Sequence, residues 1–181
     1  MPALEPGSLS HWALIRRQFA RHRLAVASLF LLAVLYALAL GAEFFAPYPR
    51  QWRDLSHAYC PPQLPRFSPE HGLYVPAMKR LIDPLTLKKT YIEDNTRAVE
   101  LGFFVRGEPY RLWGVLPAAR HFFGVKDTAE RRPDGTAPTF YFLGADKYGQ
   151  DVFSRLVYGA RISLSVGLVS IAVTFLLGVT I

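Results

Sequence analysis

The sequence predicts an α-helical membrane protein with a small α+β domain outside the membrane. Two segments, residues 24–42 and 162–181, contain no charged side chain, so all 35 charged residues fall in the other 142. Within that remainder the charged fraction is about a quarter, which is the usual share of a soluble domain. Cys60 is the sole cysteine, so no intrachain disulfide can form. This pattern excludes a simple cytosolic globular protein, a disordered chain and a disulfide-stabilised scaffold.

The first apolar segment predicts a transmembrane helix over residues 24–46. Its 19 uncharged residues span roughly 28 Å as a helix, close to the ~30 Å thickness of a hydrocarbon core. Residues 1–23 form a basic N-terminus that the positive-inside rule places in the cytoplasm. Its topology signal consists of Arg16, Arg17, Arg21 and Arg23. A secretory signal peptide is the main alternative, but the apolar run exceeds the ~7–15 residues of a signal core. A buried core helix is the other alternative.

Residues 47–143 predict an extracytoplasmic insert domain. Twelve of the 14 prolines lie in 43–140 and cluster early, so 43–84 is expected to form neither a continuous helix nor a central strand. The aromatic residues spread through this stretch favour an ordered arm rather than disorder.

Three local elements are expected within and beside the insert. Residues 82–98 are mixed in character and allow a short helix. Apolar alternation over 98–116, interrupted by the turn residues 106–109, predicts a β-hairpin. A further short strand is expected at 138–143.

The sequence offers no set of residues for catalysis, so we expect no enzyme activity and no cofactor or metal. The five histidines are scattered without an HExxH pattern, and there is no phosphate-binding loop. Basic and acidic residues are intermixed, which argues against a nucleic-acid partner. Cys60 is interpreted as a thiol without a role.

Residues 144–161 predict a short amphipathic helix at the membrane interface. Asp151 can serve as its N-cap and stands four residues before Arg155, a spacing that suits an ion pair. The apolar stripe that follows at helical spacing comprises Val152, Phe153, Leu156, Val157 and Ala160. We expect Arg155, Tyr158 and Arg161 to face lipid headgroups or a partner.

Residues 162–181 predict a second transmembrane helix of about 30 Å. Small residues recur every fourth position, which allows close helix packing in lipid. They are Gly159, Ser163 and Gly167, and then Ser170, Thr174 and Gly178. The expected partners are helices outside this chain, and we interpret the chain as a fragment truncated at Ile181.

The stretch from residue 144 to residue 164 resembles the signature before the second membrane helix of binding-protein-dependent ABC permeases. It is most similar to the C-type subunit of the dipeptide, oligopeptide and nickel class. The matching positions are Gly144, Asp146, Gly149, Asp151, Ser154, Arg155, Gly159 and Arg161. The basic lead, the apolar span and residues 42–48 match more loosely. The sequence departs from the pattern at Ala145, commonly Thr, and at Gln150, commonly Arg.

The resemblance implies a multi-pass subunit of six helices in the bacterial inner membrane, with both termini cytoplasmic. It also implies a second permease subunit, two cytoplasmic ATPase subunits and an extracytoplasmic solute-binding protein as partners. The transported solute would be a peptide, an oligosaccharide or nickel. The alternative from another class is a membrane-anchored extracytoplasmic adaptor or sensor domain.

Overall fold

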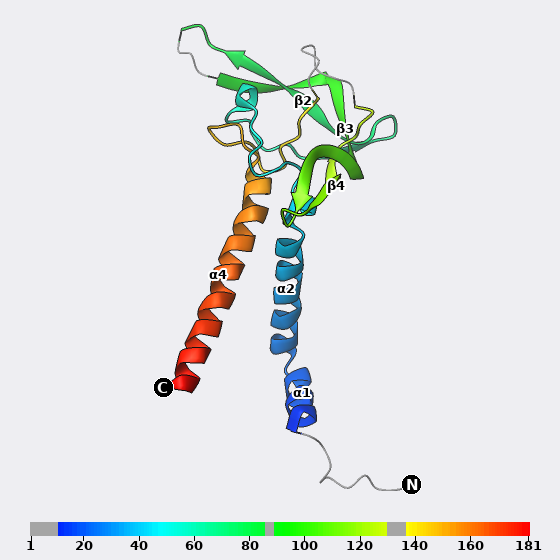
Figure 1. Ribbon diagram of the computed structural model, residues 1–181. Helices are drawn as coiled ribbons and strands as arrows, with labels where there is room; N and C mark the ends of the chain where they lie inside the picture. Colours follow the sequence, from blue (N-terminus) through cyan, green and yellow to red (C-terminus); the bar gives the residue numbers. More distant parts are fainter. Residues whose placement is uncertain (1–10, 86–88, 130–136) are drawn as a thin grey trace, which may run out of the picture. The chain divides into compact units, whose positions relative to one another are not determined.

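A computed structural model describes residues 11–85, 89–129 and 137–181, apart from the side chain at position 95 (Figure 1). The chain divides into two compact units, Met1–Ala37 and Leu38–Ile181. Each is described by itself.

The first unit holds two helices, α1 (His11–Arg21) and most of α2 (Arg23–Leu40). His22 separates the two helices and caps the start of α2. Its carbonyl accepts a hydrogen bond from the Val26 N–H at 3.1 Å, and its Nδ1 accepts one from the Ala25 N–H at 3.3 Å. Helix α2 is long and apolar enough to cross a membrane. It ends at Leu40, where Gly41 interrupts the helix before the short helix α3 (Ala42–Phe45).

The second unit ends in helix α4 (Val152–Thr180), whose 29 residues give a length of roughly 44 Å. It too is long and apolar enough to span a membrane. The helix has no break, so the segments expected as an interfacial helix and a second span form one helix. It begins at Val152 rather than at 144, and residues 144–151 form a closed turn bridged between Ala145 and Asp151.

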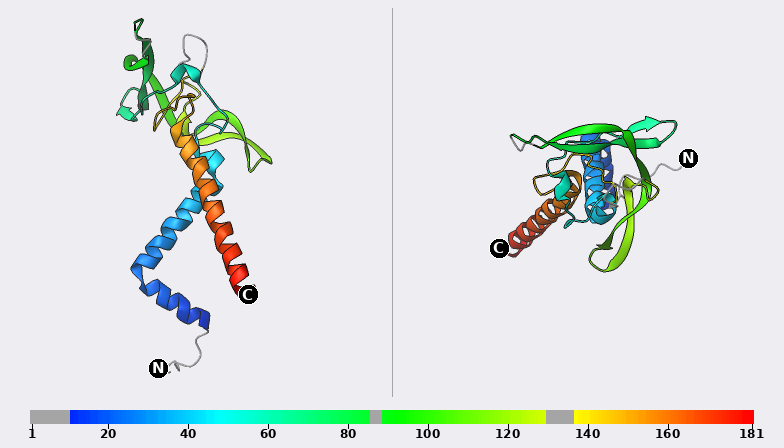
Figure 2. Two further views of the ribbon diagram at one scale, coloured as in Figure 1. Left: turned by 90° about the vertical axis from the view of Figure 1, so that its left-hand side faces the viewer. Right: turned by 90° about the horizontal axis from the view of Figure 1, so that it is seen from above.

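The insert is built on an antiparallel sheet in the order β1-β2-β3-β4. The strands are β1 (Arg66–Ser68), β2 (Gly72–Ile82), β3 (Lys89–Leu112) and β4 (Leu116–Val125). The 24-residue β3 pairs through its first half with β2 and through its second half with β4. Figure 2 shows, from above, how the β3–β4 half curves away from the β2–β3 half.

Two clusters of buried side chains hold the second unit together. Val75, Val99, Leu101 and Phe140 form the core between the sheet and the returning chain. Cys60, Tyr141 and Ala145 form the other cluster, with Trp52, Met78 and Tyr91 packed against it. Burial of Cys60 in this cluster gives the thiol a packing role that the sequence did not reveal.

Several expectations for the insert were wrong. The described part of 82–98 contains β-strand and no helix, and 138–143 contains no strand. The hairpin exists, but its turn lies at 113–115, and residues 107–109 form an irregularity in β3 between Arg106 and Tyr110. A bulge absorbs the extra residues, so turn-forming chemistry here bends a strand rather than ending it.

Proline also proved compatible with an inner strand. Pro76 lies in β2, between β1 and β3, although the prolines of 43–84 had argued against a central strand. The β1 pairing ends at Tyr74 and the β3 register shifts between Pro76 and Ala77. The missing N–H of Pro76 therefore falls where no ladder bond is required. The insert is consequently a curled sheet with little helix rather than an α+β domain.

Candidate functional site

The carbonyl end of α2 is held by Arg161 from α4. Its Nε donates to the Ala39 carbonyl at 2.7 Å and its Nη2 to the Leu40 carbonyl at 2.9 Å. Its Nη1 donates to the Glu43 carboxylate at 2.6 Å, and Glu43 is only 8% exposed. The last carbonyls of a helix lack partners within the helix and carry partial negative charge, so a planar guanidinium suits this position. Arg161 therefore caps a helix here, instead of facing headgroups or a partner as expected.

A tryptophan from the β3–β4 hairpin completes this helix end. The Trp113 Nε1–H donates to the Leu40 carbonyl at 2.9 Å, so that one oxygen accepts from both Trp113 and Arg161. Trp113 has a φ of 51°, which is uncommon for a residue other than glycine. We call Ala39, Leu40, Glu43, Trp113 and Arg161 the helix-end junction.

Buried His121 links the end of α3 to the bulge of β3. Its Nδ1 lies 2.6 Å from the Ala46 carbonyl oxygen and its Nε2 lies 2.9 Å from the Glu108 carbonyl oxygen. A carbonyl oxygen only accepts hydrogen bonds, and each ring nitrogen faces one such oxygen. Gly107 permits this approach, because a Cβ there would lie 2.8 Å from the imidazole Cδ2.

The closed turn 144–151 is hydrogen-bonded to the arm, which is the segment of residues 47–63 that follows α3. The Asp54 N–H donates to the Gly149 carbonyl at 3.1 Å, and the Tyr59 N–H donates to the Asp146 carbonyl at 3.0 Å. In return, the Ala145 N–H donates to the Cys60 carbonyl at 2.9 Å. The signature glycines are therefore needed for a backbone-to-backbone contact.

Gly144 and Gly149 both adopt left-handed backbone conformations, with φ of 83° and 70°. A Cβ on Gly149 would lie 1.9 Å from the Asp54 carbonyl oxygen, and one on Gly144 would lie 2.7 Å from the Cys60 carbonyl oxygen. Only glycine meets both demands, a positive φ and an absent side chain.

Asp146 organises the turn and takes the place expected for Asp151 in the ion pair with Arg155. Its carboxylate accepts from the backbone N–H groups of Tyr148 at 2.8 Å and Gln150 at 2.9 Å, and it pairs with Arg155. Burial alone would raise the pKa of Asp146, but these hydrogen bonds and the guanidinium outweigh it and lower that pKa. The expected Asp151–Arg155 pair is therefore wrong.

Asp151 is confirmed as the N-cap of α4. Its Oδ2 accepts from both the N–H and the hydroxyl of Ser154 at 2.7 Å. Its side chain is buried, and burial raises the pKa of the carboxyl despite those hydrogen bonds. Ser154 in turn accepts from the Tyr48 N–H at 3.2 Å, which ties the start of α4 to the arm.

The remaining residues singled out in the sequence lie on exposed helix surfaces. The topology arginines are exposed on α1 and α2, at positions 16, 17, 21 and 23. The small residues of α4 are exposed at positions 159, 163, 167, 170, 174 and 178. Space is open around Gly159, Gly167 and Gly178. Helix packing by these residues stays a prediction.

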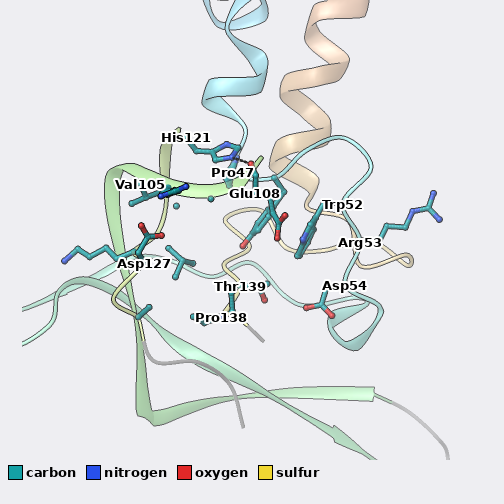
Figure 3. Close-up of a pocket in the computed structure, with 18 of the residues that line it drawn as sticks. Pro47, Trp52, Arg53, Asp54, Val105, Glu108, His121, Asp127, Pro138 and Thr139 are labelled. Atoms are coloured by element: carbon teal, nitrogen blue, oxygen red, sulfur yellow. Dashed lines mark hydrogen bonds between the residues drawn. The ribbon is translucent and has the colours of Figure 1, made fainter. Parts of the chain in front are cut away.

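A cavity of about 670 Å³ opens between the arm and the β3–β4 ribbon (Figure 3). Trp52, Arg53 and Asp54 line one side, and Glu108 and Asp127 belong to the other. Groups of both charges thus line the cavity. Among the described residues no three His, Cys, Asp or Glu side chains are grouped to hold a metal ion.

Comparison with known proteins gives the class. Residues 10–62 match the family model described as the N-terminal TM domain of oligopeptide transport permease C. With the two apolar helices, this match supports a bacterial inner-membrane protein that is similar to transport permeases. Within that class, the chain resembles the C-type permease subunits of peptide ABC importers.

Individual relatives match over short stretches. The chain is 51% identical over 39 residues to the dipeptide transport system permease protein DppC of Bacillus subtilis (strain 168), covering 22% of this chain and 12% of that protein. It is 42% identical over 41 residues to DppC of Alkalihalophilus pseudofirmus, and 44% identical over 41 residues to the glutathione transport system permease protein GsiD of Pectobacterium atrosepticum. These two alignments each cover 23% of this chain and 14% of the relative. No solved structure matches the chain.

Three residues of the site escaped the sequence analysis. Glu43 fell within the predicted helix 24–46, Trp113 within the predicted hairpin, and His121 among five scattered histidines. Of these three residues, only Glu43 is marked by a feature of the sequence, because it is the first acidic residue after an uncharged run. Its partner is 118 positions away, and no local pattern connects the two.

Proposed function

We propose that this chain forms the beginning of a transmembrane permease subunit of an ABC importer. In this proposal it contributes to a translocation pathway for peptides, or related solutes, delivered by an extracytoplasmic solute-binding protein. A second permease subunit and two cytoplasmic ATPase subunits complete the importer. The family match over residues 10–62 carries the proposal, and it favours a permease over a membrane-anchored adaptor or sensor.

The helix-end junction supports this role. It ties the outer end of α2, the start of the insert and the outer part of α4 into one hydrogen-bonded unit. Backbone carbonyls left without partners in an apolar surrounding are costly, so a junction that satisfies them suits a helix end at the edge of a membrane. The cavity between the arm and the β3–β4 ribbon is lined by groups of both charges, which suits contact with a polar protein surface.

The orientation is tested by labelling single cysteines. Cys60→Ser removes the native thiol, and Gln18→Cys or Thr90→Cys then adds one exposed thiol on α1 or on β3. In intact spheroplasts a membrane-impermeant maleimide should label the Thr90→Cys protein and spare the Gln18→Cys protein until the membrane is opened. Labelling of both variants, or of Gln18→Cys alone, would refute the proposed topology.

Transport itself is tested by uptake of radiolabelled dipeptides and tripeptides in cells that carry the full-length gene. Disruption of the gene should abolish the uptake of at least one of them, and the wild-type gene should restore it. If uptake of peptides, oligosaccharides and nickel all survives disruption, the importer proposal is wrong.

A further inference from the structure

We propose that the tip of the β3–β4 hairpin, residues 111–116, inserts into the outer interfacial layer of the lipid bilayer beside the end of α2. This inference rests on the membrane location within the proposed function, and not on transport. The hairpin would then anchor the curled sheet to the membrane at a second point besides the helices.

The position of the tip follows from its hydrogen bond to a membrane-spanning helix. Leu40 is the last residue of α2, and its carbonyl accepts from the Trp113 Nε1–H. A helix of 18 residues is about 27 Å long, so its end lies close to the boundary of the hydrocarbon core. Trp113 therefore sits at the depth where tryptophan rings concentrate in membrane proteins, with an apolar ring and a polar N–H.

The composition of the tip matches that depth. Trp113 is 61% exposed, Val115 is 77% exposed and Leu116 is 56% exposed, and Leu40 continues the same apolar surface at 59%. Arg111 is exposed beside them, at a position from which a long cationic side chain reaches phosphate groups. A tight turn presents these side chains, since the Val115 N–H donates to the Leu112 carbonyl at 3.1 Å and both Trp113 and Gly114 have positive φ.

The size of the surface favours lipid over a protein partner. Three exposed side chains of this size offer on the order of 300–400 Å², at most half of the ~800 Å² that each side of a stable protein interface contributes. The tip also adjoins Leu40, the last residue of α2, whose carbonyl it contacts and whose side chain is itself exposed. Its occupant is therefore the bilayer itself.

Quenching of tryptophan fluorescence by brominated lipid tests this placement. The chain has three tryptophans, so the Trp12→Phe/Trp52→Phe variant of the full-length protein retains Trp113 as the reporter within this segment. Further tryptophans beyond residue 181 are replaced by phenylalanine in every variant. Reconstitution is in phosphatidylcholine nanodiscs brominated either near the headgroup end or near the methyl end of the acyl chains. The matched control, Trp12→Phe/Trp113→Phe, retains Trp52, which stacks on Tyr48 in the arm at 4.0 Å between ring centroids.

Trp113 should be quenched roughly twofold more than Trp52 by the headgroup-end label, and more by that label than by the methyl-end label. Val115→Asp in the same background should bring the quenching of Trp113 down to the level of Trp52, because a charge opposes insertion of the tip. Equal quenching of Trp113 and Trp52, or quenching of Trp113 that Val115→Asp leaves unchanged, overturns the proposal.

Two further measurements separate the possible reasons for a negative result. A single tryptophan introduced by Leu35→Trp on α2 should be quenched by lipid whether or not the hairpin inserts. If this reporter is not quenched, the membrane location in the proposed function fails, and not the hairpin alone. Quenching of Trp113 should also persist when the protein is assembled with its partner subunits. Its disappearance on assembly would show that a protein surface covers the tip and would refute a lipid contact.

Discussion

Gly149 illustrates how much of this unit depends on the absence of one side chain. The turn carries its carbonyl to the Asp54 N–H and leaves no room for a Cβ against the Asp54 carbonyl oxygen. Part of the signature read in the sequence is thus a set of backbone contacts, and Gly144 and Gly149 are needed there for space as well as for conformation.

Replacing Gly149 by alanine should lower the free energy of unfolding by more than about 2 kcal/mol, because both a positive φ and a backbone clash oppose it. Gly72→Ala is the matched control and should cost only about 1 kcal/mol, since Gly72 also has a positive φ but a Cβ there meets nothing within 4 Å. Thermal unfolding in detergent measures both. Equal stabilities would show that the arm does not rest on the turn as described.

Asp146 should make part of the stability depend on pH. Its pKa is lowered in the folded protein, so the carboxylate contributes stability that is fully present above the ordinary aspartate pKa of 3.8 and is lost as the pH falls through the lowered value. Asp146→Asn should therefore be less stable than the wild type at neutral pH, by about 1–3 kcal/mol for hydrogen bonds to a charged group.

The difference should narrow as the pH falls from 3.8 through the lowered pKa, because the unfolded chain takes up the proton first and the folded carboxyl loses its charge only at that lowered value. Unfolding midpoints of the two proteins in urea between acidic and neutral pH provide the measurement. A gap that stays constant over that range would contradict an ionised Asp146 as its source.

At the scale of elements, helices and strands meet through side chains that satisfy backbone carbonyls. Arg161 of α4 serves the end of α2, Trp113 of the hairpin serves the same carbonyl, and His121 of β4 serves the chain just after α3. These hydrogen bonds, in addition to apolar packing, hold the insert against the end of α2, the chain after α3 and the first turns of α4.

Arg161 and Glu43 should be energetically coupled. A double-mutant cycle with Arg161→Gln and Glu43→Gln should give a coupling free energy of about 1–3 kcal/mol, since each single change leaves a shielded partner without its counter-charge. Arg161→Lys keeps the charge but cannot reach Glu43 and two carbonyls with one planar group, so it should recover less than half of the loss. Additive single effects in thermal unfolding would show that the two residues do not interact.

His121→Phe should destabilise the insert while preserving the ring volume. The change removes both ring nitrogens from the Ala46 and Glu108 carbonyls, and a buried carbonyl left without its donor costs about 1–3 kcal/mol. His71, which is exposed and pairs with Glu100 at 3.9 Å, provides the control, and His71→Phe should change stability by less than about 1 kcal/mol. Similar effects from the two changes would argue against the buried double contact.

At the scale of the whole molecule, the insert has a natural point of removal. Gln63 and Tyr141 are joined by two hydrogen bonds. The Gln63 N–H donates to the Tyr141 carbonyl at 2.9 Å, and the Tyr141 N–H donates to the Gln63 Oε1 at 2.8 Å. Replacing residues 64–137 of the full-length protein by a short Gly/Ser linker should therefore leave the turn 144–151 folded on the arm. We expect membrane insertion to persist and uptake that depends on the binding protein to be lost.

Binding-protein docking, measured by pull-down with the purified partner, separates a docking role from a purely structural one. Loss of uptake with loss of docking fits an insert that contacts the binding protein. Full uptake in the shortened protein would show that the sheet is dispensable. Phe140→Ser should accompany the deletion, because Phe140 packs into the sheet core and would otherwise be exposed.

The sequence revealed the features that depend on neighbouring residues, and it missed those made by distant ones. The two uncharged runs predicted helices α2 and α4, and Asp151 was recognisable as an N-cap because its partner Ser154 lies three residues away. The ion pair of Arg155 was assigned to Asp151, since spacing along a helix cannot show that the turn brings Asp146 back. The hairpin turn was placed at 106–109 because glycine and proline bend a strand or end it with the same local chemistry.

The helix-end junction also constrains the order of events during synthesis. The ribosome adds Arg161 to the growing chain 118 residues after Glu43. At ~5–20 residues per second, Arg161 is therefore made about 6 to 24 s later than Glu43. Trp113 is made earlier, 73 residues after Leu40. During that interval the carbonyls at the end of α2 depend on water, headgroups or the hairpin for hydrogen bonds. The nascent first span therefore stays adjustable in depth until the hairpin closes and the second span arrives to fix it.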